Sequence, residues 1–179
     1  MKKSFEEIIE IPDGISCSIS GQVLKCSLGS LTVEKLISLP NIYISINDGK
    51  ILLSSKGSKK ELKIIKSYSA HIKNIFLGLK KPFVYKLEAC NVHFPITLKL
   101  EKKRLIINNF LGEKVPRAAD ILFGVSIDIK GQKITLSSYD KSSAGQTAAN
   151  IEKATKIKNR DRRIFQDGIF IVEKPGKSI

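Results

Sequence analysis

The densest group of side chains that could do chemistry lies between residues 153 and 163, called the basic segment below. It contains one acidic residue, Asp161, and these six basic residues: Lys153, Lys156, Lys158, Arg160, Arg162 and Arg163. Planar guanidinium groups can bond a phosphate through two N–H donors at once, and ammonium groups bind it as point charges. The basic segment therefore predicts an RNA-binding surface. The alternative is a solvated charged stretch, balanced by Glu152 and Asp161.

The overall charge favours RNA binding. The chain has 31 Lys and Arg residues against 17 Asp and Glu residues, which gives a formal net charge of +14. Such an excess usually indicates a polyanionic partner, either nucleic acid or an anionic membrane surface. Two smaller basic features are candidates for the same surface, Lys114 with Arg117 and, in the C-terminal tail, Lys174 with Lys177. Phe110 could stack on a base, but its place beside a Leu-Gly turn is more typical of a core residue.

Arrangements typical of catalytic or metal sites are missing from the sequence. The two histidines, His71 and His93, have no metal-ligand spacing to Cys, Asp or Glu, and no GxSxG turn carries a serine nucleophile. Cys17, Cys26 and Cys90 form no CxxC pair, and we expect small, buried, reduced cysteines on strands. The prediction is a protein without catalytic residues, cofactor, metal or small-molecule substrate, and therefore not an enzyme.

The elements that must position the basic segment follow an internal duplication. A shift of 83 residues aligns Leu28–Ser55 with Leu111–Ser138 without a gap. The identical pairs include Leu28/Leu111, Gly29/Gly112, Ile44/Ile127, Ile46/Ile129, Lys50/Lys133, Ile51/Ile134, Leu53/Leu136, Ser54/Ser137 and Ser55/Ser138. Agreement of this extent indicates two copies of one unit. We place the domains at residues 1–82 and 83–179, the second carrying the basic segment and the tail.

Each copy has the pattern of a β-hairpin followed by a helix. Apolar residues alternate with polar ones through 42–46 and again through 125–129, and each run is followed by a turn and a return strand. Further strands are expected at 15–19, 23–27, 84–90, 96–100 and 104–108. The predicted fold class is α+β, with two duplicated domains, each a mainly antiparallel β-sheet with one amphipathic α-helix packed on it.

The two helices are predicted from apolar residues at helical spacing. The first runs through Leu79 after a capping box formed by Ser58 and Glu61. The second has a narrower apolar face and a predicted cap formed by Ser143 and Gln146. Because each copy alone has only a modest core, we expect the two copies to support each other.

The charge leaves two alternatives to consider, a peripheral membrane protein and a stand-alone double-stranded-RNA module. A peripheral membrane protein would need a helix that pairs Lys or Arg with exposed Trp, Phe or Leu, and the chain has no Trp. The longest uncharged stretch, Leu36–Asn47, is too short to span a bilayer. A stand-alone double-stranded-RNA module has a single copy of its fold, unlike this chain. We therefore expect no membrane partner.

Three segments of the chain share a family resemblance. Residues 144–163 and 165–175 contain the basic segment, a Phe-Gln-Asp-Gly-Ile-Phe run and a Glu-Lys-Pro end. Residues 109–117 read Asn-Phe-Leu-Gly-Glu-Lys-Val-Pro-Arg, and residues 9–14 give a looser match. Together they resemble the universal large-subunit ribosomal protein six family in its archaeal and eukaryotic form.

The resemblance implies a structural constituent of the large ribosomal subunit in the cytoplasm. The implied partners are large-subunit ribosomal RNA and neighbouring ribosomal proteins, with the C-terminal domain docked near the translation-factor-binding region and stalk base. The chain departs from the family twice. The usual Gly-Pro-Lys-Gly turn before Leu31 is here Ser27–Ser30, and the basic run after Arg117 is shortened to Arg117–Asp120. These departures predict weaker RNA contacts by the first domain and by the Arg117 loop.

Overall fold

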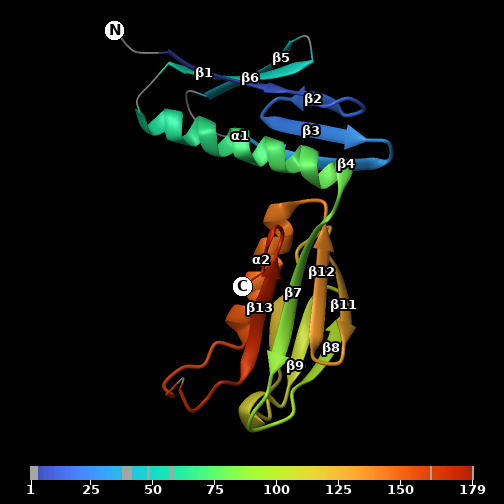
Figure 1. Cartoon of the computed structure of the whole chain (residues 1–179), viewed down its shortest axis with the longest axis vertical. Coiled ribbons are helices and arrows are strands. Elements are labelled where there is room, and N and C mark those ends of the chain that lie inside the picture. The colour runs from blue at the N-terminus through green and yellow to red at the C-terminus, as the bar shows by residue number, and fades with distance from the viewer. Residues whose placement is uncertain (1–3, 38–41, 48, 57–58, 162, 179) are drawn as a thin grey trace. The chain divides into compact units, whose positions relative to one another are not determined.

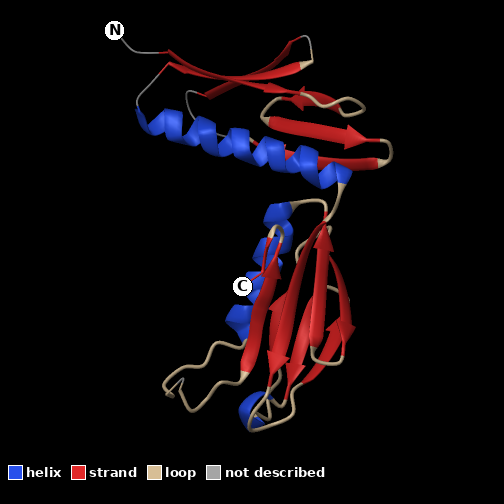
Figure 2. Ribbon diagram, in the orientation of Figure 1, coloured by secondary structure: helices blue, strands red, loops and turns tan. Residues whose placement is uncertain are grey.

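The residues that the computed structural model describes are 4–37, 42–47, 49–56, 59–161 and 163–178. The chain divides into two compact units, an N-terminal unit, Met1–Lys81, and a C-terminal unit, Pro82–Ile179 (Figure 1). Both combine strands with one long helix, which confirms the predicted α+β class (Figure 2). Every strand pairing in the described residues is antiparallel.

The N-terminal unit packs one helix against two three-stranded sheets. Its elements are β1 (Ser4–Glu10), β2 (Ser16–Ser20), β3 (Val23–Leu28), β4 (Leu31–Leu36), β5 (Ile42–Asn47), β6 (Lys50–Lys56) and α1 (Lys59–Lys80). The sheets have the orders β1-β6-β5 and β2-β3-β4. The predicted apolar face of α1, including Ile65, Ile72 and Phe76, is buried in one core with Ile51 and Leu53 of β6. The sequence did not predict that the strands divide between two sheets.

The C-terminal unit repeats this plan and adds two strands. Its elements are β7 (Phe83–Cys90), β8 (Thr97–Glu101), β9 (Arg104–Asn108), η1 (Phe110–Gly112), β10 (Arg117–Asp120), β11 (Ser126–Lys130), β12 (Lys133–Ser138), α2 (Lys141–Ala154), β13 (Gly168–Lys174) and β14 (Lys177–Ser178). The sheets have the orders β11-β12-β7-β13-β14 and β10-β9-β8. Ala148 and Ile151 of α2 share a core with residues of both sheets. Among the described residues, no helix combines the length and hydropathy that crossing a membrane requires.

The strand registers confirm the duplication. Ile44 of β5 faces Leu53 of β6, and the residues 83 positions later, Ile127 and Leu136, face each other in β11 and β12. The 83-residue shift does not match equivalent structural positions for the first two identical pairs, Leu28/Leu111 and Gly29/Gly112. Leu28 ends β3, whereas its aligned partner lies within η1. The physical reason is that β9 and β10 are joined by a longer connection than the two-residue turn between β3 and β4.

The observed cap of α2 differs from the predicted one, whereas the predicted cap of α1 depends on a residue that the structure does not describe. Ser58 lies outside the described residues, and its predicted partner Glu61 accepts a hydrogen bond from the Ser55 hydroxyl. The cap of α2 predicted at Ser143 is wrong, because the Asp140 carboxylate accepts the backbone N–H of Ser142 at 3.0 Å and of Ser143 at 3.1 Å. An acidic N-cap satisfies these free donors and also complements the positive end of the helix.

Candidate nucleic-acid interface

The basic segment begins in the last turn of α2 and forms most of the connection to β13, a strand of the five-stranded sheet (Figure 1). Thr155 joins these two elements because its buried hydroxyl donates to the Glu152 carbonyl at 3.2 Å and accepts the Ile169 N–H at 2.9 Å. The chain between Lys156 and Asp167 has no regular helix or strand in its described residues. Its position therefore depends on contacts made by individual side chains.

Arg117 holds the beginning of this irregular stretch. Its Nη1 donates to the carbonyls of Ala154 at 2.9 Å and Lys156 at 3.4 Å, which lie where α2 ends. Its Nε and Nη2 donate to the two carboxylate oxygens of Glu113 at 2.8 and 2.5 Å. Carbonyls at the end of a helix lack intrahelical partners, so the guanidinium satisfies groups that would otherwise need water.

The surroundings of Arg117 keep its guanidinium in place. The group lies 4.3 Å from the ring centroid of Phe110, which is 1% exposed, so the expectation of a core position for Phe110 is confirmed. The hydrogen bond from Arg117 lowers the pKa of the Glu113 carboxyl, and the nearby charges of Arg117 and Arg160 act in the same direction. Glu113 is therefore ionised at neutral pH and balances Arg117.

A buried carboxylate holds the other end of the stretch. Asp167 is 1% exposed and accepts the backbone N–H groups of Val92 at 2.8 Å and His93 at 3.0 Å. Its second oxygen lies 2.6 Å from His93 Nδ1. Burial alone would raise the pKa of Asp167, but the hydrogen bonds from His93 and Val92 outweigh it, and the net effect is a lowered pKa. The carboxylate thus ties this stretch to the connection that follows β7.

An aromatic stack links this anchor to the basic segment. The rings of His93 and Phe165 are stacked, with centroids 5.0 Å apart and an interplanar angle of 26°. The Arg160 guanidinium lies 4.7 Å from the centroid of the same Phe165 ring. A cation over an aromatic face is attracted to it, so the stack orders one of the arginines predicted to bind phosphate.

Asp161, expected to balance the positive charge, has a local role in the backbone. Its carboxylate accepts the Arg163 N–H at 2.9 Å, and its carbonyl accepts the Phe165 N–H at 2.9 Å. The exposed Arg163 side chain lies 3.7 Å from the same carboxylate. Asp161 therefore shapes the turn that leads to Phe165, and its ion-pair partner among the described residues is its close neighbour Arg163.

Five of the predicted site residues meet around one hollow of about 290 Å³. They are Arg117, Lys153, Lys156, Lys158 and Arg160. The acidic residue in the lining, Glu113, is engaged by Arg117. Within the described residues, none of the other four cations makes an ion pair. The hollow thus has an excess of positive charge and N–H donors, which suits a bound phosphate.

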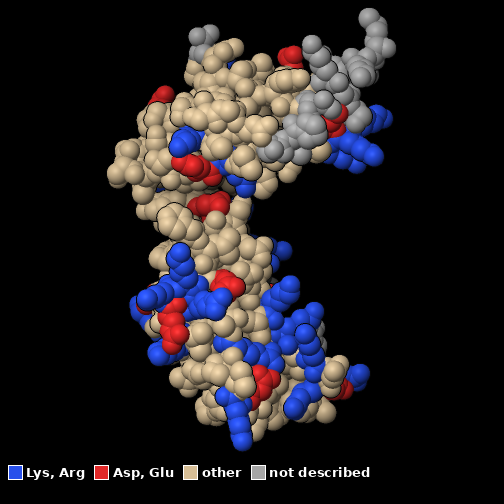
Figure 3. All heavy atoms as spheres, turned by 180° about the vertical axis from the view of Figure 1, so that it is seen from behind, with Lys and Arg blue, Asp and Glu red and all other residues tan. Residues whose placement is uncertain are grey.

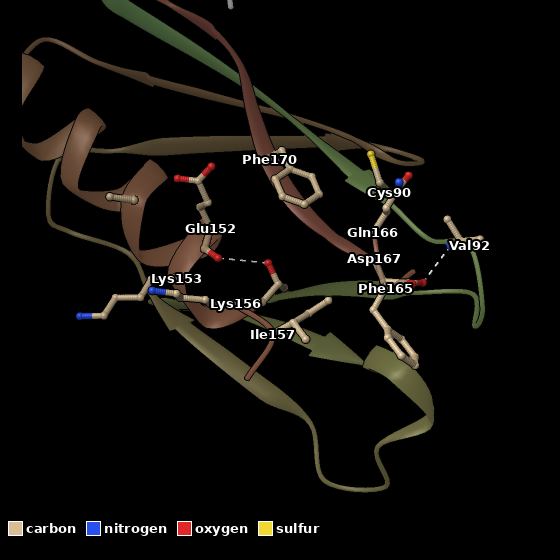
Figure 4. Close-up of a pocket in the computed structure, with 12 residues that line it drawn as sticks. Cys90, Val92, Glu152, Lys153, Lys156, Ile157, Phe165, Gln166, Asp167 and Phe170 are labelled. Atoms are coloured by element: carbon tan, nitrogen blue, oxygen red, sulfur yellow. Dashed lines mark hydrogen bonds between the residues drawn. The ribbon is translucent and has the colours of Figure 1, made fainter. Parts of the chain in front are cut away.

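A larger groove of about 830 Å³ lies between α2, the irregular stretch and the strands β7 and β13 (Figure 4). Glu152 and Lys153 come from the helix, whereas Cys90 and Phe170 come from the strands. Lys153 and Lys156 line both this groove and the smaller hollow. The same two cations can therefore contact a ligand that spans both depressions. The face in Figure 3 shows many Lys and Arg side chains over the C-terminal unit.

The remaining predicted site residues lie elsewhere or are not described. Lys114 is exposed in the bend before β10, and Arg162 lies outside the described residues. Lys174 and Lys177 face each other in the β13–β14 hairpin. Because Lys174 is six residues along β13 from Gly168, at about 3.3 Å per residue it lies roughly 20 Å from the end of β13 that adjoins the basic segment.

Three residues important for the site were missed by the sequence prediction: His93, Glu113 and Asp167. His93 has no metal-ligand spacing in the sequence, and among the described residues no group of three or more His, Cys, Asp and Glu side chains could hold a metal ion. Its partner Asp167 is 74 residues away, so spacing along the chain carries no signal of the pair. The Asp-Gly step within residues 165–170 was the available hint.

Comparison with known proteins identifies close relatives over nearly the whole chain. Residues 94–168 match the family described as ribosomal protein L6. Over 175 residues the chain is 42% identical to the large ribosomal subunit protein uL6 of Methanosarcina mazei, an alignment that covers 97% of this chain and 99% of that protein. The protein of the same name from Methanococcus vannielii is 41% identical over 172 residues, covering 96% of this chain and 94% of that protein.

Proposed function

Because this chain belongs to the ribosomal protein L6 family and is a structural constituent of the large ribosomal subunit, we propose that its C-terminal unit binds large-subunit ribosomal RNA through the basic segment. The family is structural and not enzymatic, and its place is the cytoplasmic ribosome. The proposal rests mainly on one observation, the convergence of Lys153, Lys156, Lys158 and Arg160 around a hollow in which Arg117 already engages the acidic residue.

The proposed mechanism is phosphate neutralisation by prepositioned cations. Each Lys or Arg that contacts an RNA phosphate releases condensed counterions, so affinity falls as salt rises. Folded RNA is read mainly by its shape, through phosphate and 2′-hydroxyl contacts. Arg160 can offer N–H donors to a phosphate from its place against Phe165, and Lys153 and Lys156 can follow the backbone from the hollow into the groove.

The two anchors at the ends of the irregular stretch support this mechanism. Ordering a long side chain or a loop on binding costs about 0.5–1.5 kcal/mol per side chain. Arg117 at one end and Asp167 with His93 at the other already fix the backbone that carries the cations. We assign Arg117 mainly to positioning, since its donors bond to Glu113 and to two backbone carbonyls.

The finer location follows from the family resemblance. We place the C-terminal unit on rRNA near the translation-factor-binding region and stalk base, with neighbouring ribosomal proteins as further partners. Lys114, Arg162 and Arg163 remain candidate RNA contacts outside the hollow, and Lys174 and Lys177 are candidates for which we expect a much smaller contribution. Crosslinking in assembled subunits, followed by mapping of the linked nucleotides, tests this placement.

The direct test removes the four cations together, as K153A/K156A/K158A/R160A. If each cation neutralises one phosphate, the slope of log affinity against log salt should become shallower by about 3 for large-subunit rRNA. The matched control, K59A/K60A/K63A/K66A, removes the same charge from exposed positions on α1. An unchanged slope in the first variant, or an equal loss in both, would reject the basic segment as the RNA contact. Binding to anionic vesicles in place of rRNA would favour the membrane alternative.

A further inference from the structure

Two cysteines of the N-terminal unit lie side by side on neighbouring strands. Cys17 of β2 and Cys26 of β3 are direct cross-strand partners. The Cys17 thiol donates a hydrogen bond to the Cys26 sulfur, with 3.2 Å between the two sulfur atoms. Both are free thiols, and the third cysteine, Cys90, lies on β7 of the C-terminal unit. Spacing along the chain carries no sign of this pair, because Cys17 and Cys26 are nine residues apart and form no CxxC motif.

The backbone at this pair already has the spacing that a disulfide needs. Residues directly opposite each other in antiparallel strands have Cα atoms about 4.5–5.5 Å apart. Disulfide-bonded cysteines usually have Cα atoms about 4.4–6.8 Å apart. The bond can therefore form by rotation of the two side chains, without separation of β2 and β3.

The two thiols differ in a way that assigns them different roles. Cys17 is partly exposed, whereas Cys26 is fully buried. The hydrogen bond with Cys26 lowers the pKa of Cys17, and the same bond, followed by burial, raises the pKa of Cys26. Since the thiolate is the nucleophile, Cys17 is the thiol that reacts first. Burial, with the charges of Glu88 and Asp167, raises the pKa of Cys90, so that thiol is the less reactive one despite its exposure.

The duplicated unit shows that packing alone does not require cysteines here. Counted from the two-residue turns that close the equivalent hairpins, Cys17 and Cys26 correspond to Leu98 and Ile107. Those aliphatic residues are also direct cross-strand partners, and Ile107 is fully buried. The C-terminal copy thus fills these positions with aliphatic side chains, whereas the N-terminal copy places two reactive groups in contact.

We propose that Cys17 and Cys26 form a modification site that a peroxide oxidises to a cross-strand disulfide. The Cys17 thiolate attacks one oxygen of hydrogen peroxide, the O–O bond breaks, and the products are a Cys17 sulfenic acid and hydroxide. The Cys26 sulfur then attacks the Cys17 sulfur, the S–O bond breaks, and the departing hydroxyl leaves as water with the Cys26 proton. The two sulfurs together lose two electrons, which the peroxide gains.

The test treats the full-length reduced protein with stoichiometric hydrogen peroxide and counts its thiols by alkylation and mass spectrometry. The expected result is a fall from three alkylated cysteines to one, with Cys90 alkylated and a reducible Cys17–Cys26 cross-link. Cys90→Ser should give the same cross-link at the same rate. Oxidation of Cys90 before the pair, or over-oxidation of Cys17 without a cross-link, would overturn the proposal.

Single-cysteine variants assign the order of the two steps. In Cys26→Ala the reaction should stop at a Cys17 sulfenic acid that dimedone traps, and in Cys17→Ala the buried Cys26 should stay reduced at least tenfold longer than Cys17 does in the native protein. Rapid oxidation of Cys26 in the absence of Cys17 would contradict the assigned roles. Circular dichroism checks that each variant is folded. If Cys26→Ala unfolds, the rate and cross-link measured in Cys90→Ser still decide the proposal.

Discussion

The two units share a hairpin and a helix, but the chain continues differently after each helix. After α1 it passes into β7 and the second unit. After α2 it forms the basic segment and returns as β13, which pairs with β7 on the side opposite β12. In the N-terminal unit the described partner of β1, the counterpart of β7, is β6 alone. The proposed RNA-binding surface is thus an addition to the duplicated core.

The two units also differ at equivalent positions of their three-stranded sheets β10-β9-β8 and β2-β3-β4. Arg117 of β10 faces Ile107, and at the equivalent position of the N-terminal unit Val33 of β4 faces Cys26. A valine side chain at this position has no N–H groups that could donate to the backbone carbonyls at the end of a helix. The duplicated scaffold is thus present in both units, and the residues that anchor the proposed phosphate-binding stretch are found in the C-terminal one.

The largest expected effect comes from removing the buried anchor. Asp167→Ala leaves the N–H groups of Val92 and His93 and the His93 ring without their partner, and should destabilise the C-terminal unit by about 3 kcal/mol. Hydrogen exchange of the Val92 and His93 amides measures this locally. The control Asp128→Ala removes an exposed carboxylate of the same unit and should change the free energy of unfolding by less than about 0.5 kcal/mol.

The same anchor predicts an acid sensitivity that sharpens the contrast between the units. The folded-state pKa of Asp167 is lowered, so its contribution to stability is full above the unfolded value of about 3.8 and is lost as pH falls through the lower folded value. Amide exchange in the C-terminal unit should therefore rise below about pH 4, and this rise should be reduced in Asp167→Ala. An identical acid response in the two proteins would show that other carboxylates dominate.

A second change separates charge from geometry at Arg117. Arg117→Lys keeps the charge, but an ammonium group cannot reproduce the planar guanidinium that bonds Glu113 and two carbonyls. The affinity for rRNA should therefore fall about tenfold, or 1.4 kcal/mol, with a nearly unchanged salt slope. Arg104→Lys, at an exposed position of β9 in the same sheet, is the matched control and should bind normally. Full affinity in Arg117→Lys would mean that only the charge matters.

A smaller effect is expected from the aromatic stack. Phe165→Ala removes the ring that contacts both His93 and Arg160, and loss of a cation–π contact of about 0.5–1 kcal/mol should lower rRNA affinity roughly twofold to fivefold. Phe123→Ala, which removes a ring that is 96% exposed, should leave binding unchanged. Equal effects of the two substitutions would argue against an ordered Arg160.

The smallest effect is expected at the far end of β13. Lys174→Ala with Lys177→Ala removes two cations roughly 20 Å from the basic segment, beyond the screening length of about 8 Å at physiological salt. Affinity for rRNA should fall less than about twofold in filter-binding assays. A tenfold loss would extend the interface along the whole strand and weaken the distinction between the added stretch and the rest of the unit.

Local patterns along the chain predicted much of the fold. Alternating apolar residues identified both hairpins, and helical spacing identified the buried face of α1, because these periods depend only on which side of an element is buried. The start of α2 was misplaced because Asp140, Ser142 and Ser143 are all good capping residues, and only the observed backbone shows that Asp140 is the cap. The split into two sheets was missed because pairing between strands is not local.

The sequence by itself determined the duplication, the α+β class, the family and the density of cations between residues 153 and 163. These depend on composition, on periodicity and on matches along the chain. The tertiary structure alone decided which of those cations share a hollow, that Arg117 is bonded within the protein, and that Asp167 meets His93. It also placed Cys17 against Cys26. The physical reason is that hydrogen bonds and ion pairs act over a few ångströms in space, and residues far apart in the sequence come within that range only when the chain folds.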